Sequence, residues 1–220
     1  MSQPLQIDFV SDISCPWCII GLQGLEKALA ELGPQVQATI TFQPFELNPA
    51  MAAEGQDLAE HIAEKYGSSP EESAVNRQRI QQRAADVGFI LNSSKPGFRI
   101  YNTFDAHRLL YWAEESGKQQ ALKHALFIAY FTNGEDPSDH NVLERIVKET
   151  GLDVAAAREV LSSDRYASEV RNAERQWVNA GIHSVPSVIF DRQYLLSGGQ
   201  PPEAFKSAIE EILKQRDAEV

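Results

Sequence analysis

The sequence predicts an α/β fold in which a large all-helical segment interrupts a sheet domain. Three observations predict this class. The first 50 residues alternate between strand and helix patterns, residues 56–180 are helical, and residues 181–220 return to strands before a last helix. The chain is 43% hydrophobic and 23% charged, which is the composition of an ordinary globular protein with enough apolar surface for a core.

The first segment, residues 1–50, is expected to form a strand–helix–strand unit. Leu5–Val10 is a short apolar run that predicts a buried strand. Apolar residues then recur at spacings of three and four, which predicts a helix over Cys15–Leu32 that ends at Gly33. Val36–Gln43 alternates strictly between apolar and polar residues, the pattern of a strand. A crossover of this length favours parallel pairing of the two strands.

The second segment, residues 56–180, is predicted to be an inserted helical domain, helical throughout. Ser69 and Glu72 match a capping box, with Pro70 at the first helical position, and this helix is expected to run to about Val87. Further helices are predicted over Thr103–Ser116, Lys118–Thr132, Ser138–Thr150, Val154–Ser162 and Arg165–Ala180.

The third segment, residues 181–220, is predicted to contain an antiparallel hairpin and a final helix. Pro186–Phe190 and Tyr194–Ser197 are the two strands, and an amphipathic helix follows from about Pro202. Residues 1–50 and 181–220 are therefore expected to close into one discontinuous domain around the insertion. A strand–helix–strand unit followed by a hairpin and a helix is the thioredoxin pattern.

Charge and hydropathy exclude several classes of partner. The formal net charge is −11 at pH 7, which disfavours nucleic acid and an anionic membrane surface as partners. No apolar run approaches the ~20 residues that a membrane helix needs. The N-terminal residues have neither a basic nor an apolar region typical of a secretory signal, so a cytoplasmic location is expected.

The only two cysteines, Cys15 and Cys18, are three residues apart. A structural disulfide framework would use more cysteines, so this CxxC indicates catalysis or metal binding. Zinc would need two further ligands, and the five histidines contain no HxxxH-type pair; two cysteines buried by chance are the remaining alternative. The position between a strand and a helix favours redox chemistry, with no metal.

The CxxC spacing assigns different roles to the two sulfurs. Cys15 would lie in the first turn of its helix, where unpaired N–H groups and the helix dipole stabilise an anion, and the thiolate is the nucleophile. Cys18 would lie one turn further along and more deeply buried. We therefore expect Cys15 to attack a disulfide and Cys18 to resolve the mixed disulfide that results. Pro16 is tolerated because its missing N–H has no partner within the helix there.

Five segments resemble the DsbA-like thioredoxin superfamily. The resemblance is closest to its FrnE-like branch of cytosolic dithiol–disulfide oxidoreductases, which is related to 2-hydroxychromene-2-carboxylate isomerases and kappa-class glutathione transferases. The matching segments span nearly the whole chain: Asp12–Cys18, Pro44–Pro49, Asn102–Leu109, Gly181–Pro186 and Ser197–Pro202.

The resemblance implies a set of site residues. Pro186 is expected to follow a cis peptide bond and to belong to the catalytic site with the two cysteines, placing the Val185 backbone where an extended substrate could pair with it. For His107, which lies in a family-like motif, a hydrogen-bonded helix histidine is the favoured interpretation and a side chain facing the cleft is the alternative. His183 precedes Pro186 by three residues, and a position near the Cys15 sulfur is the less favoured of its two interpretations. The residues expected to bind substrate are Pro16, Trp17, Val185, Asn48, His107, Gly198, Gly199 and Gln200.

The resemblance also implies a function. We expect a thiol–disulfide oxidoreductase or isomerase acting on protein or small-molecule disulfides, with no permanently bound cofactor, glutathione as a candidate redox partner and a homodimer as a candidate assembly. A serine usually replaces the first cysteine in the isomerases and transferases, so Cys15 favours disulfide exchange. A glutathione-dependent isomerase or transferase is the alternative, although Gln200 stands where the transferases tend to carry an acidic residue. A non-enzymatic binding module is a third hypothesis.

Overall fold

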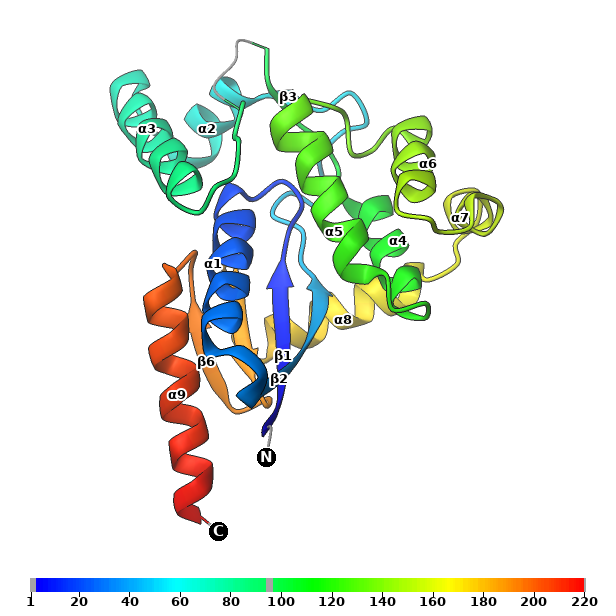
Figure 1. Ribbon diagram of the computed structural model, residues 1–220. Helices are drawn as coiled ribbons and strands as arrows, with labels where there is room; N and C mark the ends of the chain where they lie inside the picture. The colour runs from blue at the N-terminus through cyan, green and yellow to red at the C-terminus, as the bar shows by residue number, and fades with distance from the viewer. Residues whose placement is uncertain (1–2, 94–96, 220) are drawn as a thin grey trace.

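Four strands form the central sheet in the order β2-β1-β5-β6 (Figure 1). The computed structural model describes residues 3–93 and 97–219. The strands are β1 (Gln3–Ser11), β2 (Val36–Pro44), β5 (Ser187–Phe190) and β6 (Tyr194–Ser197). β1 pairs parallel with β2 and antiparallel with β5, and β5 pairs antiparallel with β6. The predicted parallel unit and the predicted hairpin are both confirmed.

Helices cover both faces of this sheet. Phe9 and Val10 of β1 point to opposite faces because side chains alternate along a strand. Phe9 belongs to the main core with α1 (Pro16–Leu32) and α9 (Pro202–Glu219), whereas Val10 packs on the other side with Trp177 of α8 (Ala167–Asn179). α8 is therefore a sheet-covering helix, although the chain reaches it only after the other inserted helices.

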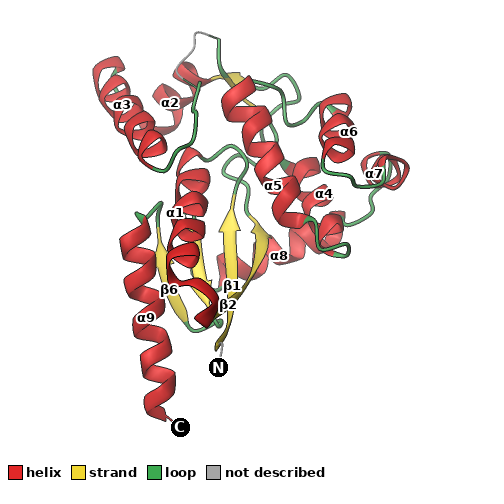
Figure 2. Cartoon of the chain, viewed as in Figure 1, coloured by secondary structure: helices red, strands yellow, loops and turns green. Residues whose placement is uncertain are grey.

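The remaining helices form a lobe above the carboxyl end of β1 (Figure 2). The capping box predicted at its second helix is confirmed: the Ser69 hydroxyl accepts from the Glu72 N–H at 3.2 Å, and the Glu72 carboxylate accepts from the Ser69 N–H at 2.9 Å. The helices of this lobe are α2 (Leu58–Tyr66), α3 (Pro70–Asp86), α4 (Phe104–Glu114), α5 (Gln119–Phe127), α6 (His140–Glu149) and α7 (Val154–Leu161).

The expectation that residues 56–180 are helical throughout is wrong at two places. β3 (Gln56–Asp57) and β4 (Arg99–Ile100) form a short antiparallel pair inside the insertion. Two-residue strands are too short to produce an alternating pattern, so they cannot be recognised from periodicity. The helix predicted to continue from α5 changes to a π-helical turn, η2, over Ile128–Asn133.

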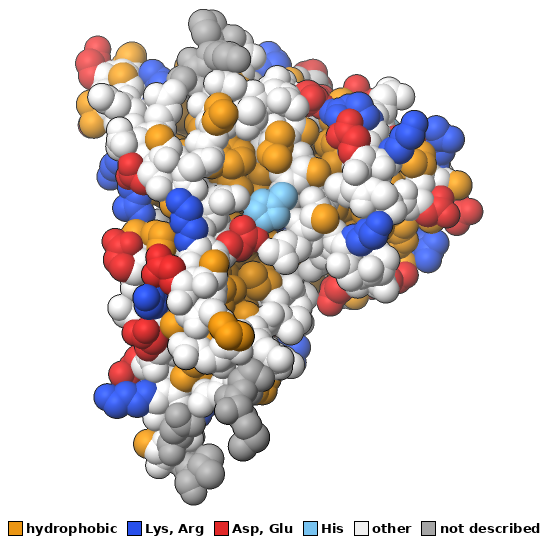
Figure 3. Space-filling model, viewed as in Figure 1, with side chains coloured by type: hydrophobic (Ala, Val, Ile, Leu, Met, Phe, Trp, Pro, Cys, Tyr) orange, Lys and Arg blue, Asp and Glu red, His pale blue; other side chains and the backbone are white. Residues whose placement is uncertain are grey.

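The described residues contain no helix that combines the length and the apolar character needed to cross a bilayer. Figure 3 shows acidic and basic side chains intermixed along one edge and over the far end of the helical lobe, with apolar side chains between these regions. On this face, the net charge of −11 is therefore not gathered into one acidic patch.

Candidate active site

Cys15 and Cys18 lie where the carboxyl end of β1 enters α1, beneath the helical lobe (Figure 1). Cys15 is the N-cap of α1 in an extended conformation (φ −94°, ψ 112°), and the Cys18 N–H donates to its carbonyl oxygen at 3.0 Å. Cys15 is 4% exposed and Cys18 is fully buried, and both are free thiols. The two sulfurs therefore differ in access, since only Cys15 reaches the surface at all.

The start of β5 lies against this first turn. The Val185–Pro186 peptide bond is cis, and the Cys15 thiol lies 3.6 Å from the Val185 carbonyl oxygen, to which it donates. A Cβ added to Gly21 of α1 would lie 3.1 Å from the Pro186 ring. Glycine at this position thus allows Pro186 to pack on the helix beside the cysteines.

Trp17 lies under the turn between β6 and α9. A Cβ on Gly199 would lie 2.8 Å from the Trp17 carbonyl oxygen and 3.0 Å from its ring. Two basic side chains of α3 also reach this place: the Arg79 guanidinium lies 5.6 Å from the Trp17 ring centroid, and Arg83 donates to the Gly199 carbonyl at 3.1 Å. The structure therefore brings Trp17, Gly199 and two positive charges together.

The rest of this turn is fixed by local contacts. Gly198 has a φ of 86°, and the Gln200 amide donates to the Ser197 carbonyl at 2.8 Å. A Cβ on Gly24 of α1 would lie 2.7 Å from the Gln200 carbonyl oxygen, so helix and turn approach closely. The Gln200 side chain is thus engaged within its own turn rather than extended toward the sulfurs.

Asp12 organises the loop that precedes the cysteines, a role that its place in the Asp12–Cys18 segment does not by itself predict. Its buried carboxylate accepts from the Ser14 hydroxyl at 2.9 Å, from the Leu47 N–H at 2.7 Å and from the Thr103 hydroxyl at 2.8 Å. His107 Nε2 lies 3.5 Å away. Burial alone would raise the pKa of Asp12, but His107, Leu47 and Thr103 outweigh it and lower the pKa to about 2.

The two candidate histidines lie in different surroundings. The His107 ring is 2% exposed and faces Asp12, so it does not line a substrate cleft in this structure. It is instead a buried helix histidine, because α4 presents this side of the helix to the carboxylate. His183 lies on an exposed turn before β5.

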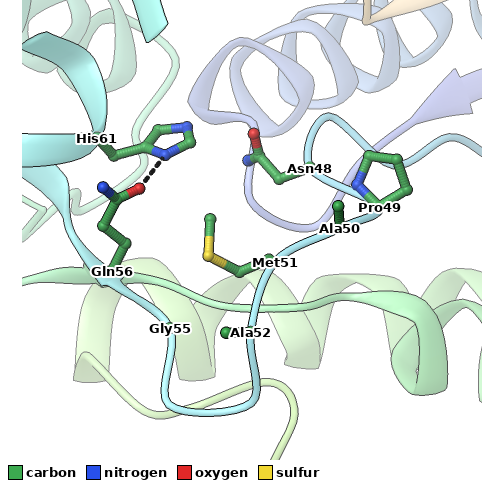
Figure 4. Close-up of a pocket in the computed structure, with 8 residues that line it drawn as sticks. All are labelled: Asn48, Pro49, Ala50, Met51, Ala52, Gly55, Gln56 and His61. Carbon is green, nitrogen blue, oxygen red and sulfur yellow. Dashed lines mark hydrogen bonds between the residues drawn. The ribbon is translucent and has the colours of Figure 1, made fainter. Parts of the chain in front are cut away.

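Asn48 lines a hollow of about 450 Å³ between the loop after β2 and the start of α2 (Figure 4). Its side-chain oxygen accepts from Lys65 Nζ at 2.6 Å, and His61 and Gln56 pair at 2.7 Å on the opposite side of the hollow. The lining residues are Asn48, Pro49, Ala50, Met51, Ala52, Gly55, Gln56 and His61.

A second residue that could not be recognised from the sequence, Lys123, is buried like Cys18 and interacts with it electrostatically. Burial, followed by the neighbouring Cys15, raises the pKa of Cys18 well above its ordinary value. Lys123 is fully buried, and its burial lowers its pKa to about 8. In the sequence this residue lies between Leu122 and His124 on a predicted helix, and a lysine at such a position is ordinarily interpreted as a surface residue.

A dithiol at the start of the first helix of a thioredoxin-like sheet, with the β5 proline packed beside it, defines a thiol oxidoreductase of the thioredoxin class. The particular family follows from comparison with known proteins. A family model described as the DSBA-like thioredoxin domain matches residues 6–210, and the chain belongs to that family.

Individual relatives agree with this assignment. A structure named as a probable DsbA oxidoreductase from Streptomyces coelicolor shares 33% identity and a TM-score of 0.86, over 94% of this chain and 89% of that one. An uncharacterized Bacillus subtilis protein, YwbO, is 24% identical over 96% of this chain and 99% of its own.

Two more distant structures share the fold. A 2-hydroxychromene-2-carboxylate isomerase has 19% identity and a TM-score of 0.70, over 98% of this chain and 99% of that one. The cytosolic disulfide reductase DsbM of Pseudomonas aeruginosa, solved with glutathione, has 16% identity and a TM-score of 0.63, over 95% of this chain and 99% of that one.

Proposed function

We propose that this protein exchanges disulfides through a mixed disulfide on Cys15. The observation that carries the proposal is the placement of the two sulfurs: Cys15 caps α1 and is 4% exposed, whereas Cys18 is fully buried one turn along the same helix. Unpaired N–H groups at a helix start point toward negative charge on a nucleophile that reacts there. The burial of Cys18 confines it to attacking a disulfide already formed on Cys15.

The exchange balances in two steps. The Cys15 thiolate attacks one sulfur of a substrate disulfide, and the other substrate sulfur leaves as a thiolate. Cys18 then attacks Cys15, the bond from Cys15 to the substrate breaks, and the second substrate thiolate leaves. The substrate gains two electrons and the protein dithiol becomes a disulfide; the reverse sequence oxidises a substrate dithiol.

Extended peptides are the substrates that this site suits best. The Val185 carbonyl beside Cys15 can accept a main-chain hydrogen bond from a segment that adds to β5 as a strand. Pro16 and Trp17 are half-buried and offer an apolar contact for the substrate next to the sulfur. Of the other expected binding residues, Gly198, Gly199 and Gln200 form the turn beside Trp17, and Asn48 belongs to the hollow at α2.

Glutathione is the small-molecule partner that we assign to the same site. The proposal is supported by the fold shared with a cytosolic reductase solved with glutathione, and by Arg79 and Arg83, whose positive charges beside Trp17 suit the two carboxylates of that tripeptide. We accordingly place the protein in the cytoplasm, in the FrnE-like branch, with no permanently bound cofactor. Having both cysteines favours disulfide exchange over the isomerase reaction of the serine-containing relatives.

Trapping of the intermediate tests the proposal. Cys18→Ser should accumulate a mixed disulfide with a cysteine-containing peptide disulfide or with oxidised glutathione, detected by mass, whereas Cys15→Ser should form none. Wild-type protein should accelerate insulin reduction by dithiothreitol, and neither variant should. A mixed disulfide on Cys18 of the Cys15→Ser protein, or a wild-type protein without acceleration, would contradict the assigned roles.

A further inference from the structure

Lys123 is a fully buried lysine, which is rare. The residue is fully inaccessible, and its Nζ atom makes no hydrogen bond within the described part of the chain. An ammonium group in a protein interior is strongly unfavourable unless an opposite charge compensates it. A buried polar group left unpaired therefore calls for a functional explanation.

The placement of Lys123 is fixed by its neighbours on α5. The Gln119 amide accepts from the Phe42 N–H at 2.8 Å and donates to the Phe42 carbonyl at 3.0 Å, which fastens the helix to β2. Gln120 and His124 both contact the Glu26 carboxylate of α1, at 2.6 and 2.7 Å. These bonds hold the helix against both elements.

The lysine is thereby directed into the space between β2 and α1. Its Nζ lies 5.0 Å from the Phe127 ring centroid and 5.9 Å from that of Phe42. Aromatic faces can attract a cation, but they do not replace the hydrogen bonds and counterion that a buried ammonium loses.

Three acidic groups interact electrostatically with Lys123 from the elements around it: Cys18, Cys15 and Asp12. The Asp12 carboxylate already has its hydrogen-bond donors, which are Ser14, Leu47 and Thr103. His107 also lies 3.5 Å from it. Cys18 is different, since it carries a negative charge only when it loses its proton. Asp12 therefore contributes a permanent charge, whereas the strongest partner of Lys123, Cys18, gains its charge only during the reaction.

We propose that the Lys123 ammonium is the countercharge for the Cys18 thiolate that resolves the mixed disulfide. The inference rests on the proposed disulfide exchange and adds a positioned charge to its second step. Cys18 loses its proton and attacks the Cys15 sulfur, the bond from Cys15 to the substrate breaks, and the departing substrate thiolate takes up a proton. Lys123 keeps its own proton and ends the step with the charge it had at the start.

The effect of this charge is large enough to measure. Burial holds Cys18 in the thiol form, and Lys123 is the neighbour that opposes this most strongly. An opposite charge near an ionisable group changes its pKa by ~1–3 units. Removing the ammonium should then lower the thiolate fraction of Cys18, and with it the rate of the resolving step, by about tenfold or more.

Lys123→Met tests the proposal because methionine keeps the length of the side chain and removes its charge. Reduced protein is mixed with 5,5′-dithiobis(2-nitrobenzoate), and the release of the coloured thiolate is followed by stopped flow. The first equivalent reports attack by Cys15 and the second reports resolution by Cys18. We expect the first phase to change less than twofold, the second to slow about tenfold at pH 7, and the pH midpoint of the second phase to rise.

Lys148→Met is the matched control, because it removes an exposed lysine from α6 and should leave both phases unchanged. A second phase in Lys123→Met with the wild-type rate and pH midpoint overturns the countercharge. Loss of the first phase in the wild-type protein would instead contradict the disulfide exchange itself.

If Lys123→Met does not fold, a measurement on the wild-type protein tests whether Lys123 is the countercharge. Lysine labelled with ¹³C and ¹⁵N allows Lys123 to be titrated by NMR in the dithiol and disulfide forms. Thiolates favour the ammonium, so the pKa of Lys123 should be higher in the dithiol form. Equal titration in the two forms overturns the proposal.

Discussion

The Cys15 thiol donates to the Val185 carbonyl oxygen at 3.6 Å, although 170 positions separate the two residues in the sequence. A thiolate, or a sulfur in a disulfide, has no proton to donate. The carbonyl is therefore released as an acceptor when Cys15 ionises or forms the mixed disulfide. This couples the chemistry of Cys15 to the main-chain contact that we propose for an extended substrate.

Methylation of one substrate amide should weaken the mixed disulfide. In a cysteine-containing peptide bound to Cys18→Ser, the amide that pairs with Val185 contributes about 0.5–1.5 kcal/mol, so its N-methylation should lower the equilibrium population of mixed disulfide roughly two- to tenfold. Quantitative mass spectrometry in a glutathione buffer measures this population. Methylation of the adjacent amide is the control, because alternate amides of a strand point away from the pairing edge. Equal effects at both positions would exclude strand addition.

Gly24→Ala should destabilise the protein although alanine is the better helix former. Alanine gains about 1 kcal/mol over glycine in an unhindered helix. Here its Cβ would lie 2.7 Å from the Gln200 carbonyl oxygen, and forced overpacking costs about 1–3 kcal/mol. Urea unfolding should show a net loss of stability. Ala30→Gly, at an exposed position of α1, is the control that measures the helix propensity alone. If Gly24→Ala were more stable than wild type, the close approach of helix and turn would be contradicted.

Local signals in the sequence predicted the elements that position the cysteines. The capping box at Ser69 and the alternation over Val36–Gln43 are complete within a few residues, so both could be recognised without tertiary information. Asp12 could not be recognised in this way, because two of its donors, Leu47 and Thr103, are distant in the sequence. Leu47 reaches the carboxylate when β2 pairs with β1, and Thr103 reaches it when the helical lobe folds onto the sheet.

The burial of Lys123 is likewise a tertiary property. Nothing in the helical pattern of α5 marks the residue as buried, and its position follows from the bonds that Gln119 and His124 make to β2 and α1. The orientation of His107 is a tertiary property too. The motif around this residue can be recognised in the sequence, but which face of α4 packs against Asp12 cannot.

Asp12→Asn should destabilise the protein at neutral pH, and the difference in unfolding free energy between the variant and wild type should disappear in acid. The pKa of Asp12 is lowered from 3.8 to about 2 in the folded protein, so its contribution is present above pH 3.8 and is lost as the pH falls through 2. The shift corresponds to about 2 kcal/mol. Urea unfolding of both proteins between pH 2 and pH 7 measures it. A difference that is constant over this range would show that the charge of Asp12 contributes nothing.

The stability difference between Glu46→Gln and wild type should depend on pH in the direction opposite to that of Asp12→Asn. Burial, then the neighbouring Glu174, raises the pKa of Glu46 to about 7, against the attraction of Arg171. The folded protein holds this proton more tightly than the unfolded chain between pH 4.5 and 7, so wild-type stability falls as the pH rises through that window.

Relative to wild type, Glu46→Gln should therefore gain about 3 kcal/mol of stability between pH 4.5 and pH 8. Chemical denaturation at several pH values measures the difference. Glu169→Gln, at an exposed position of α8, is the control and should show no such trend. A difference between wild type and Glu46→Gln that does not vary with pH would contradict the raised pKa.

Lys123→Met should be more stable than the wild-type protein at pH 7. The pKa of Lys123 falls from 10.5 to about 8 on folding, so the unfolded chain binds the proton more tightly, and folding is penalised at every pH below 8. The penalty is about 3 kcal/mol, and it should shrink as the pH rises from 8 to 10.5. Guanidinium unfolding of the reduced proteins across this range measures it. If the wild-type protein is more stable than Lys123→Met at pH 7, the ammonium stabilises the fold. If the wild-type protein is less stable but its Cys18 resolves the mixed disulfide faster, the charge is retained for the reaction.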